Sequence, residues 1–323
     1  MCRRDRIAFI AFIGSKVFEE SLWHGCRRVY KFTVAAITVE KRPSSVLAKA
    51  PPTPPPCSHI VRFAAPVFSD EVHSDIMTLQ NHLGSAVVND VDGTLYQRTL
   101  HRRSEMGPVH VIAPGGVETA RHNPFNLIRI NTNHEESDTL SVADWCLMPA
   151  NAGKEQEWRQ SVQHLWAGLI LYTLLYRDHK ERNPAGVRRL LMGEGQELRN
   201  ALHHMWESEK PFLAHVSREM REKTPNELKF IIGKARQYTE IWTCKKAALV
   251  TSDSDFCFGS LKKEPMTVYL LVAPGYENTY KPLIRSVLES ARSALHRCET
   301  VAREPVLFMM NGCRSYYESL EMW

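Results

Sequence analysis

The chain has 323 residues, 43% of them hydrophobic and 24% charged, and its formal net charge at pH 7 is +5. This balance is typical of a soluble globular protein and excludes disorder of the whole chain. The longest uninterrupted apolar stretch, residues 165–176, is shorter than the roughly 18–20 residues that cross a hydrocarbon core. We therefore expect no transmembrane helix. The eight cysteines are scattered without a Cys-x-x-Cys pair, which predicts reduced thiols in a cytoplasmic protein.

The positive charge is concentrated near the N-terminus. Residues 1–57 contain ten Lys and Arg against four Asp and Glu, and prolines fill five of the six positions from 51 to 56. Because consecutive prolines hold an extended linker, residues 1–75 are predicted to form a basic segment separate from the rest of the chain. Such a segment binds nucleic acid or an anionic membrane surface, or is a solvated leader without a partner.

After the linker, short apolar runs alternate with helical periods, which is typical of a parallel sheet with crossover helices. The first unit comprises a buried strand over 85–91, a polar helix over 95–105 and a second strand over 109–113. A later stretch repeats this order with a strand over 266–273, a helix over 280–296 and a strand over 306–310. These two stretches predict an α/β domain.

The block between these stretches is predicted to be helical. One long apolar face, which must pack against other helices, is formed by residues that recur at spacings of three and four: Trp158, Val162, Leu165, Leu169, Tyr172 and Tyr176. Asn183-Pro184 begins a short helix that ends at Gly193, and residues 224–227 (Thr-Pro-Asn-Glu) form a capping box at the start of another. The economical architecture is an all-alpha insertion over 137–242 inside the α/β domain.

Two positions are candidates for catalysis because each follows a predicted parallel strand, where ligands bind in such sheets. Asp90 begins the sequence Asp-Val-Asp-Gly, which predicts either a metal–phosphate site or a tight strand-to-helix turn. Asn311, followed by Gly312, stands where a phosphate-hydrolysing enzyme places an acidic pair, although Asn-Gly is also a common turn. The chain has no glycine-rich loop ending in Gly-Lys-Ser/Thr.

The histidines do not indicate a metal centre from their spacing. His203, His204 and His215 lie in predicted helices without a carboxylate or third ligand at a useful distance in the sequence. They are interpreted as helix-surface or core residues, and no metal ligand is predicted.

The order of the segments resembles the motor domain of type IV secretion coupling proteins, the TraG-type conjugative DNA transfer family. The family shows a Gly-Ser-apolar strand followed by Asp-x-Lys-Gly-Glu, then a helix with an arginine and an Asn-Pro turn. The matching segments here are 84–96, Arg98-Thr99, Arg103, Gly107, Val109, 123–126, Trp158 with the helix over 165–176, 224–227, 252–256, 265–274, 280–285 and 305–310.

The resemblance implies a partial RecA-like P-loop NTPase sheet with an inserted all-alpha domain. Its motor would occupy residues 76–136 and, truncated, 243–323, and the insertion over 137–242 would contact substrate and relaxosome proteins. Family members are membrane-anchored homo-hexameric ATPases that use ATP and Mg²⁺. They bring relaxase-bound DNA or effector proteins to type IV secretion channel proteins.

Several departures from the family pattern predict reduced activity. Residues 68–83, shortly before Gly84, contain no glycine and no lysine, Asp92 replaces the family lysine, and Asn311-Gly312 replaces the acidic pair. We expect neither ATP nor Mg²⁺ to bind and no hydrolysis, because a missing phosphate loop removes most of the charge stabilisation that phosphoryl transfer needs. The chain is expected to be truncated and divergent at both ends.

Three hypotheses remain open from the sequence. The first is a divergent coupling protein that recruits substrate without ATPase activity. The second is a non-catalytic interaction module, or a gene remnant, derived from that family. The third is a nucleic-acid-binding protein that acts through the basic segment at residues 1–57.

Overall fold

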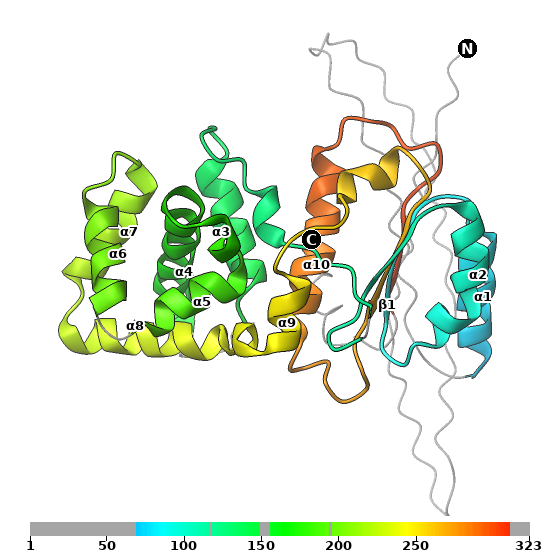
Figure 1. Cartoon of the computed structure of the whole chain (residues 1–323), viewed down its shortest axis with the longest axis horizontal. Coiled ribbons are helices and arrows are strands. Elements are labelled where there is room, and N and C mark those ends of the chain that lie inside the picture. The colour runs from blue at the N-terminus through cyan, green and yellow to red at the C-terminus, as the bar shows by residue number, and fades with distance from the viewer. Residues whose placement is uncertain (1–68, 117, 149–155, 194–195, 311–323) are drawn as a thin grey trace, which may run out of the picture. The chain divides into compact units, whose positions relative to one another are not determined.

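The computed structural model describes residues 69–310 apart from 117, 149–155 and 194–195 (Figure 1). The basic N-terminal segment up to residue 68, the proline-rich linker and Asn311 lie outside these residues. Four parallel strands form one sheet in the order β2-β3-β1-β4. The strands are β1 (Ala86–Asp90), β2 (Val109–Ile112), β3 (Thr267–Leu271) and β4 (Leu307–Met310). All four predicted strands are present, each slightly shorter than expected.

The register places β1 at the centre of the sheet. Val87 is opposite Val268 of β3 and Phe308 of β4. The segments predicted as one βαβ unit, β1 and β2, are parallel but not adjacent, because β3 from much later in the chain lies between them. The continuous apolar character of these strands fits a sheet that is covered on both faces.

Helices cover both faces of the sheet. Because side chains alternate along a strand, Ala86 and Val88 face a cluster with Leu79 and Leu95, while Val87 faces a second cluster that includes residues of α10. Leu79 belongs to α1 (Ser69–Asn81) and Leu95 to α2 (Thr94–Met106). Figure 1 shows α1 and α2 on one side of β1 and α10 (Lys281–Arg297) on the other. The helices predicted over 95–105 and 280–296 are confirmed, whereas α1 was not predicted.

The middle of the chain is helical, as predicted. Its helices are α3 (Glu135–Trp145), α4 (Gln156–Tyr176), α5 (Pro184–Met192), α6 (Gln196–Trp206), α7 (Pro211–Glu222) and α8 (Pro225–Tyr238), and α9 (Lys245–Val250) follows them. Short 3-10 turns occupy Pro124–Leu127, His179–Glu181, Glu240–Thr243 and Phe258–Lys262. Within the described residues, no helix combines the length and the apolar character needed to cross a membrane.

Both predicted helix starts are confirmed. The Gly186 backbone N–H donates to Oδ1 of Asn183 at 3.0 Å, which caps α5. The Glu227 N–H donates to Oγ1 of Thr224 at 3.3 Å, and the Thr224 N–H donates to Oε2 of Glu227 at 2.8 Å, completing the capping box of α8. These reciprocal bonds satisfy backbone donors that have no partner within the helix, so they fix where it begins.

The long helix α4 differs from the amphipathic helix that the sequence predicts. Trp166 and Ile170 lie off the predicted apolar face yet are fully buried, while Tyr176, on that face, is 44% exposed. The reason is that α3, α5, α7 and α8 all contact α4, so its central turns are enclosed. A helix surrounded in this way needs apolar residues around its whole circumference.

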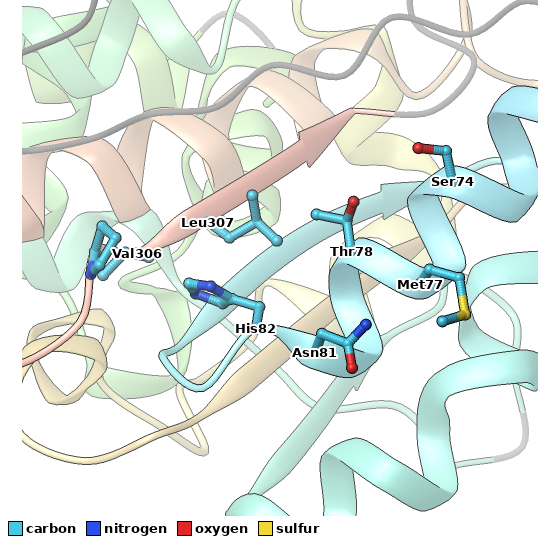
Figure 2. A pocket seen from close by; sticks show the side chains of 8 residues that line it. Ser74, Met77, Thr78, Asn81, His82, Val306 and Leu307 are labelled. Atoms are coloured by element: carbon cyan, nitrogen blue, oxygen red, sulfur yellow. The ribbon is translucent and has the colours of Figure 1, made fainter.

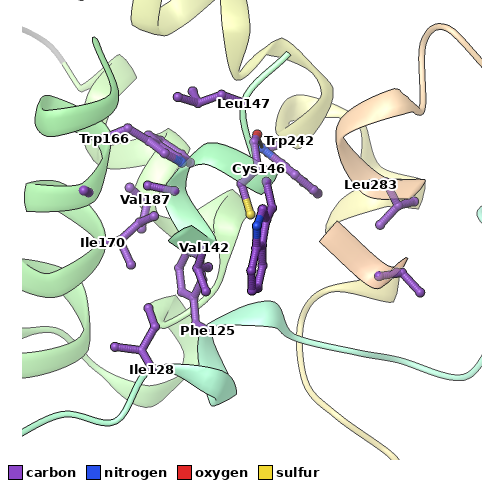
Figure 3. Close-up of a cluster of buried hydrophobic side chains, with 14 of the residues drawn as sticks. Phe125, Ile128, Val142, Cys146, Leu147, Trp166, Ile170, Val187, Trp242 and Leu283 are labelled. Carbon is purple, nitrogen blue, oxygen red and sulfur yellow. Dashed lines mark hydrogen bonds between the residues drawn. The ribbon is translucent and has the colours of Figure 1, made fainter. Parts of the chain in front are cut away.

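The helices α3 to α8, which we call the helical block, share one hydrophobic core with the sheet. Figure 3 shows Trp166 and Val142 of the block near Cys146 and Trp242, with Leu283 of α10 on the other side. Nε1 of Trp242 donates to the Cys146 carbonyl oxygen at 2.8 Å, which satisfies a buried donor. The same apolar cluster includes Val87 and Val268 of the sheet, so the two parts pack into one continuous core.

Candidate functional site

The candidate residue Asp90 lies at the carboxyl end of the central strand β1. Its side chain is fully buried, and the Tyr96 backbone N–H at the start of α2 donates to its Oδ2 at 2.8 Å. The other oxygen, Oδ1, is also buried and receives no hydrogen bond from a described N–H or hydroxyl group. A carboxyl group in this position has a high desolvation cost when it is ionised.

The turn after Asp90 is formed by residue types suited to it. Gly93 has φ 74°, a left-handed conformation that non-glycine residues adopt at a cost, and it directly precedes α2. The Thr94 N–H donates to Oδ1 of Asp92 at 3.0 Å, which binds the turn to the first residue of the helix. The Asp-Val-Asp-Gly sequence therefore forms a tight strand-to-helix turn, which is one of the two structures predicted for it.

The two carboxyl groups of this turn differ in their protonation. The pKa of Asp90 is raised to about 6, mainly by burial and also by the Asp92 carboxylate, which accepts a hydrogen bond from protonated Asp90, while the hydrogen bond from the Tyr96 N–H opposes the increase. Burial opposes ionisation of Asp92 as well, but hydrogen bonds from the backbone and side chain of Thr94 outweigh it and lower the pKa of Asp92. The pair therefore holds a proton on Asp90 more readily than two exposed aspartates would.

The residues around Asp90 do not fit a nucleoside triphosphate with Mg²⁺. A phosphate loop needs successive backbone amides and a lysine ahead of the helix that precedes β1. That helix is α1, and residues 59–68 before it contain no glycine and no lysine. At the second predicted position, Met310 is opposite Asn89 in the sheet, and Asn311 lies outside the described residues.

A cavity of about 510 Å³ lies elsewhere on the sheet. Figure 2 shows it between α1 and the start of β4, lined by residues that include Thr78, His82 and Leu307. Leu307 is opposite Ala86, the first residue of β1, so the cavity is at the other end of the strand from Asp90. No Asp, Glu, Lys or Arg side chain among the described residues lines it, so it offers little to a phosphate or a metal ion.

His215 is an exposed helix residue, as interpreted from the sequence, but the prediction that no carboxylate stands at a useful spacing from it is wrong. One ligand atom each from His164, His215 and Glu219 lies within 4.8 Å of the other two. Glu219 is four residues after His215, a spacing visible in the sequence, but His164 comes from another helix and carried no such signal. His203 and His204 have other neighbours: Nδ1 of His203 lies 3.3 Å from Oε2 of Glu207, and the His204 ring is 4.5 Å from that of Tyr176.

An aromatic and basic surface on α8 faces solvent. It forms a shallow groove of about 410 Å³ lined by Asn226, Lys229, Phe230, Gly233, Lys234 and Gln237. The Phe230 side chain is 44% exposed, and Nζ of Lys234 lies 5.8 Å from the centre of its ring. Exposed rings with nearby ammonium groups are the surface on which nucleic-acid bases stack while phosphates are neutralised. We call this groove the α8 surface.

Comparison with solved structures identifies the fold. The chain is similar to the bacterial conjugative coupling protein TrwBdeltaN70 in its unbound form, with a TM-score of 0.53, 14% identity and coverage of 78% of this chain and 62% of that one. This confirms the predicted class, an α/β RecA-like sheet with inserted helices. TrwB has also been solved in complex with ADP and Mg²⁺, in a structure whose TM-score with this chain is 0.44.

Two curated proteins from Escherichia coli, each named conjugal transfer protein TraG, are 24% and 22% identical to the chain over 241 and 245 residues. The match covers 70% of this chain but 38% of each relative, so the chain spans less than half of their length. A family model described as "Type IV secretory system Conjugative DNA transfer" matches residues 72–312, well over half of the chain. The protein therefore belongs to the conjugative DNA transfer family of the type IV secretory system.

Proposed function

We propose that this protein binds substrate for conjugative DNA transfer and brings it to a type IV secretion channel without hydrolysing ATP itself. Relaxase-bound DNA, relaxosome proteins and channel proteins are the partners that family membership supports. The observation that carries the proposal is a difference between the helical block and the carboxyl end of the sheet. The helical block is well packed and α5 and α8 have side-chain caps, whereas the turn over residues 90–94 at the carboxyl end of β1 offers two carboxyl groups, those of the buried Asp90 and of Asp92, and no lysine or arginine.

The proposed lack of ATPase activity is supported by the chemistry at Asp90. Phosphoryl transfer depends on positive groups and Mg²⁺ that neutralise charge developing on the phosphate oxygens. Asp90 is fully buried, so it could contact a divalent cation only if the turn after β1 opened, and its burial disfavours the ionised form that a cation needs. With no glycine or lysine over residues 59–68, the chain also offers no loop to hold the phosphates.

We assign substrate contact to the α8 surface. Phe230 supplies a face for base stacking, and Lys229 and Lys234 line the same groove on either side of it in the sequence. The Phe230 ring also packs against Trp158 of α4, with ring centres 5.3 Å apart. That contact fixes the ring in position before substrate arrives, which lowers the ordering cost of binding.

The first test is nucleotide binding by the purified full chain, measured with a fluorescent ATP analogue and Mg²⁺ and followed by hydrolysis with and without single-stranded DNA. We expect no saturable binding and no DNA-stimulated hydrolysis. Saturable binding would contradict the proposal, because it requires a phosphate site that these residues do not supply. Far-UV circular dichroism on the same sample establishes that the protein is folded; an unfolded chain would favour the gene-remnant hypothesis.

A second test measures binding of fluorescently labelled single-stranded DNA by anisotropy. Phe230→Ala should weaken binding about tenfold, since base–aromatic stacking contributes roughly 1–3 kcal/mol per base. Tyr276→Ala is the matched control, because Tyr276 is also an exposed aromatic residue, at 57%, and lies outside the α8 surface. Equal affinities for the two variants would remove the α8 surface from the proposal.

The same assay distinguishes the basic N-terminal segment as an alternative DNA-binding element. If that segment binds DNA, deleting residues 1–57 abolishes binding and Phe230→Ala has no effect. If the α8 surface binds, the deletion leaves a measurable affinity that Phe230→Ala still reduces. Lys229→Gln should then lower the slope of log affinity against log salt by about one, the amount expected for one phosphate contact.

A further inference from the structure

A cluster of three metal-ligating side chains lies between α4 and α7, away from the α8 surface and from Asp90. His164 comes from α4, and His215 and Glu219 come from α7, four residues and so about one turn apart on one helix face. Nδ1 of His164 is 2.7 Å from Oε2 of Glu219, and the rings of His164 and His215 have their centres 6.1 Å apart. The three ligand atoms are mutually within 4.8 Å.

Close packing of the two helices brings the cluster together. Gly168 lies one turn after His164, and a Cβ atom added there would be 2.8 Å from Cγ1 of Val216, the neighbour of His215. Even an alanine at position 168 would require Val216 of α7 to shift, together with the end of the Met205 side chain, whose Cε would lie 2.7 Å away. The glycine therefore sets the helix separation at which an imidazole from one helix reaches a carboxylate on the other.

The Glu219 carboxylate is held so that one oxygen is directed at the imidazole. Oε1 accepts a hydrogen bond from Oγ of Ser161 at 2.6 Å and lies 4.0 Å from Nζ of Lys223. Oε2 faces His164. The side chains of His164 and Glu219 are 18% and 19% exposed, and His215 is exposed at the edge of the cluster. His164 and Glu219 are thus held in a partly enclosed position, and His215 is exposed to solvent beside them.

We propose that His164, His215 and Glu219 form a binding site for a divalent transition-metal ion of the zinc type. Two imidazoles and one carboxylate are the donor set that such ions take when they keep further positions for water. Ligand atoms around a tetrahedral zinc lie about 3.3 Å apart, so the exposed His215 ring must rotate, and the His164–Glu219 pair, 2.7 Å apart here, must separate slightly and release the proton of its hydrogen bond. The bound ion cross-links α4 to α7. The proposal does not depend on the proposed role in DNA transfer.

The site is tested by titrating Co²⁺, a spectroscopic substitute for Zn²⁺, into the full chain and following its visible absorption, with Zn²⁺ competition to measure affinity. We expect one saturable equivalent and a rise in the thermal unfolding temperature on adding Zn²⁺, because an ion that binds the folded state stabilises it. Bands in the near ultraviolet from cobalt–thiolate charge transfer would instead assign the binding to cysteines and overturn the proposal.

Substitutions complete the test. His215→Ala removes an exposed ligand, so the variant should fold normally. It should weaken Co²⁺ binding at least tenfold, because removing even a residue that hydrogen-bonds to a metal ligand typically lowers metal affinity by tenfold or more. Glu219→Gln should weaken it similarly. His203→Ala, an exposed helical histidine outside the cluster, is the matched control and should bind as the wild type does. Undiminished binding in His215→Ala, or no saturable binding by the folded wild type, overturns the proposal.

Discussion

The Asp90 carboxyl destabilises the folded protein whenever it is ionised, because it is buried at the end of β1 and burial raises its pKa to about 6. An unfolded chain loses this proton near pH 4, so between about pH 4 and about pH 6 the folded state binds more protons and its stability falls as pH rises. Asp90→Asn removes this dependence and keeps an acceptor for the Tyr96 N–H. We expect it to raise the free energy of unfolding by about 2 kcal/mol at pH 8, with little change at pH 4.

Urea denaturation of the wild type and Asp90→Asn at both pH values measures that difference. The exposed Asp178 provides a control, since Asp178→Asn should leave stability unchanged at either pH. A variant less stable than the wild type at pH 8 would indicate that the ionised Asp90 has a favourable partner in solution, and would contradict the charge state assigned to this position.

Arg103 is also a buried ionisable residue, but, unlike the Asp90 carboxyl, its charged group is stabilised by several hydrogen bonds. It is 1% exposed, and its guanidinium donates to Oγ1 of Thr267 at 2.7 Å and to the carbonyl oxygens of His82 and Gly84 at 2.5 and 2.6 Å. These bonds join the end of α1 and the start of β1 to β3. The resemblance includes an arginine in the predicted helix over 95–105, but it did not predict that this side chain connects three segments by hydrogen bonds.

Arg103→Lys should lower the free energy of unfolding by about 2 kcal/mol, because an ammonium cannot reproduce the fixed fork of donors and leaves buried carbonyls without partners. Arg102→Lys is a matched control on the same helix. Its side chain is 49% exposed and pairs with Glu105 at 3.1 Å, so the substitution should cost little. Similar stabilities of the two variants in urea would show that the Arg103 hydrogen bonds are replaceable.

Helix α3 connects the helical block to the sheet through two carboxylates. Asp138 lies 2.7 Å from Arg297 of α10 and 2.8 Å from Arg129, and Asp144 pairs with Arg285 of α10 and with Arg159 of α4. Burial opposes ionisation of Asp138, but hydrogen bonds from Arg129 and the charge of Arg297 outweigh it and lower its pKa. The stabilising contribution of Asp138 is therefore present at neutral pH and is lost as pH falls below its unfolded value.

Asp138→Asn should lower the free energy of unfolding at pH 7 by about 2 kcal/mol, because it leaves the partly buried Arg297 without a counter-charge. The Asp138 side chain is 4% exposed and accepts hydrogen bonds from both Arg129, which is 41% exposed, and Arg297, which is 24% exposed, so both pairs contribute to the loss. Chemical denaturation measures it, and Asp178→Asn again serves as the exposed control. A loss that persists unchanged at pH 3 would not fit an ionic contribution.

At the scale of the whole molecule, one apolar cluster runs from the sheet through α10 into the helical block. Five of the seven tryptophans, at positions 145, 158, 166, 206 and 242, lie within that block or directly after it. Because the core is continuous, we expect tryptophan fluorescence and far-UV circular dichroism to report the same unfolding transition. Fluorescence that changes at a lower denaturant concentration would show that the helices unfold apart from the sheet.

Much of the architecture could be predicted from local patterns. The four strands follow from short apolar runs, and α5 and α8 begin where Asn183 and Thr224 provide side-chain caps. Helix α1 was not predicted because Ser69–Asn81 is a mostly polar sequence in which, among the residues whose burial is described, Leu79 is the one that is buried. The domain boundaries at residues 137 and 242 stay predictions, since the core crosses both parts without interruption.

What the sequence by itself determined was the four strands, the starts of the capped helices α5 and α8, and the absence of a glycine–lysine phosphate motif from these residues, because hydrophobic periodicity, caps and such motifs are properties of neighbouring residues. Only the tertiary structure decided that β3 separates β1 from β2, that Asp90 is buried rather than open to a ligand, and that His164 meets Glu219 from 55 positions away. These depend on which distant segments pack together, a choice made by the whole core that no local pattern records.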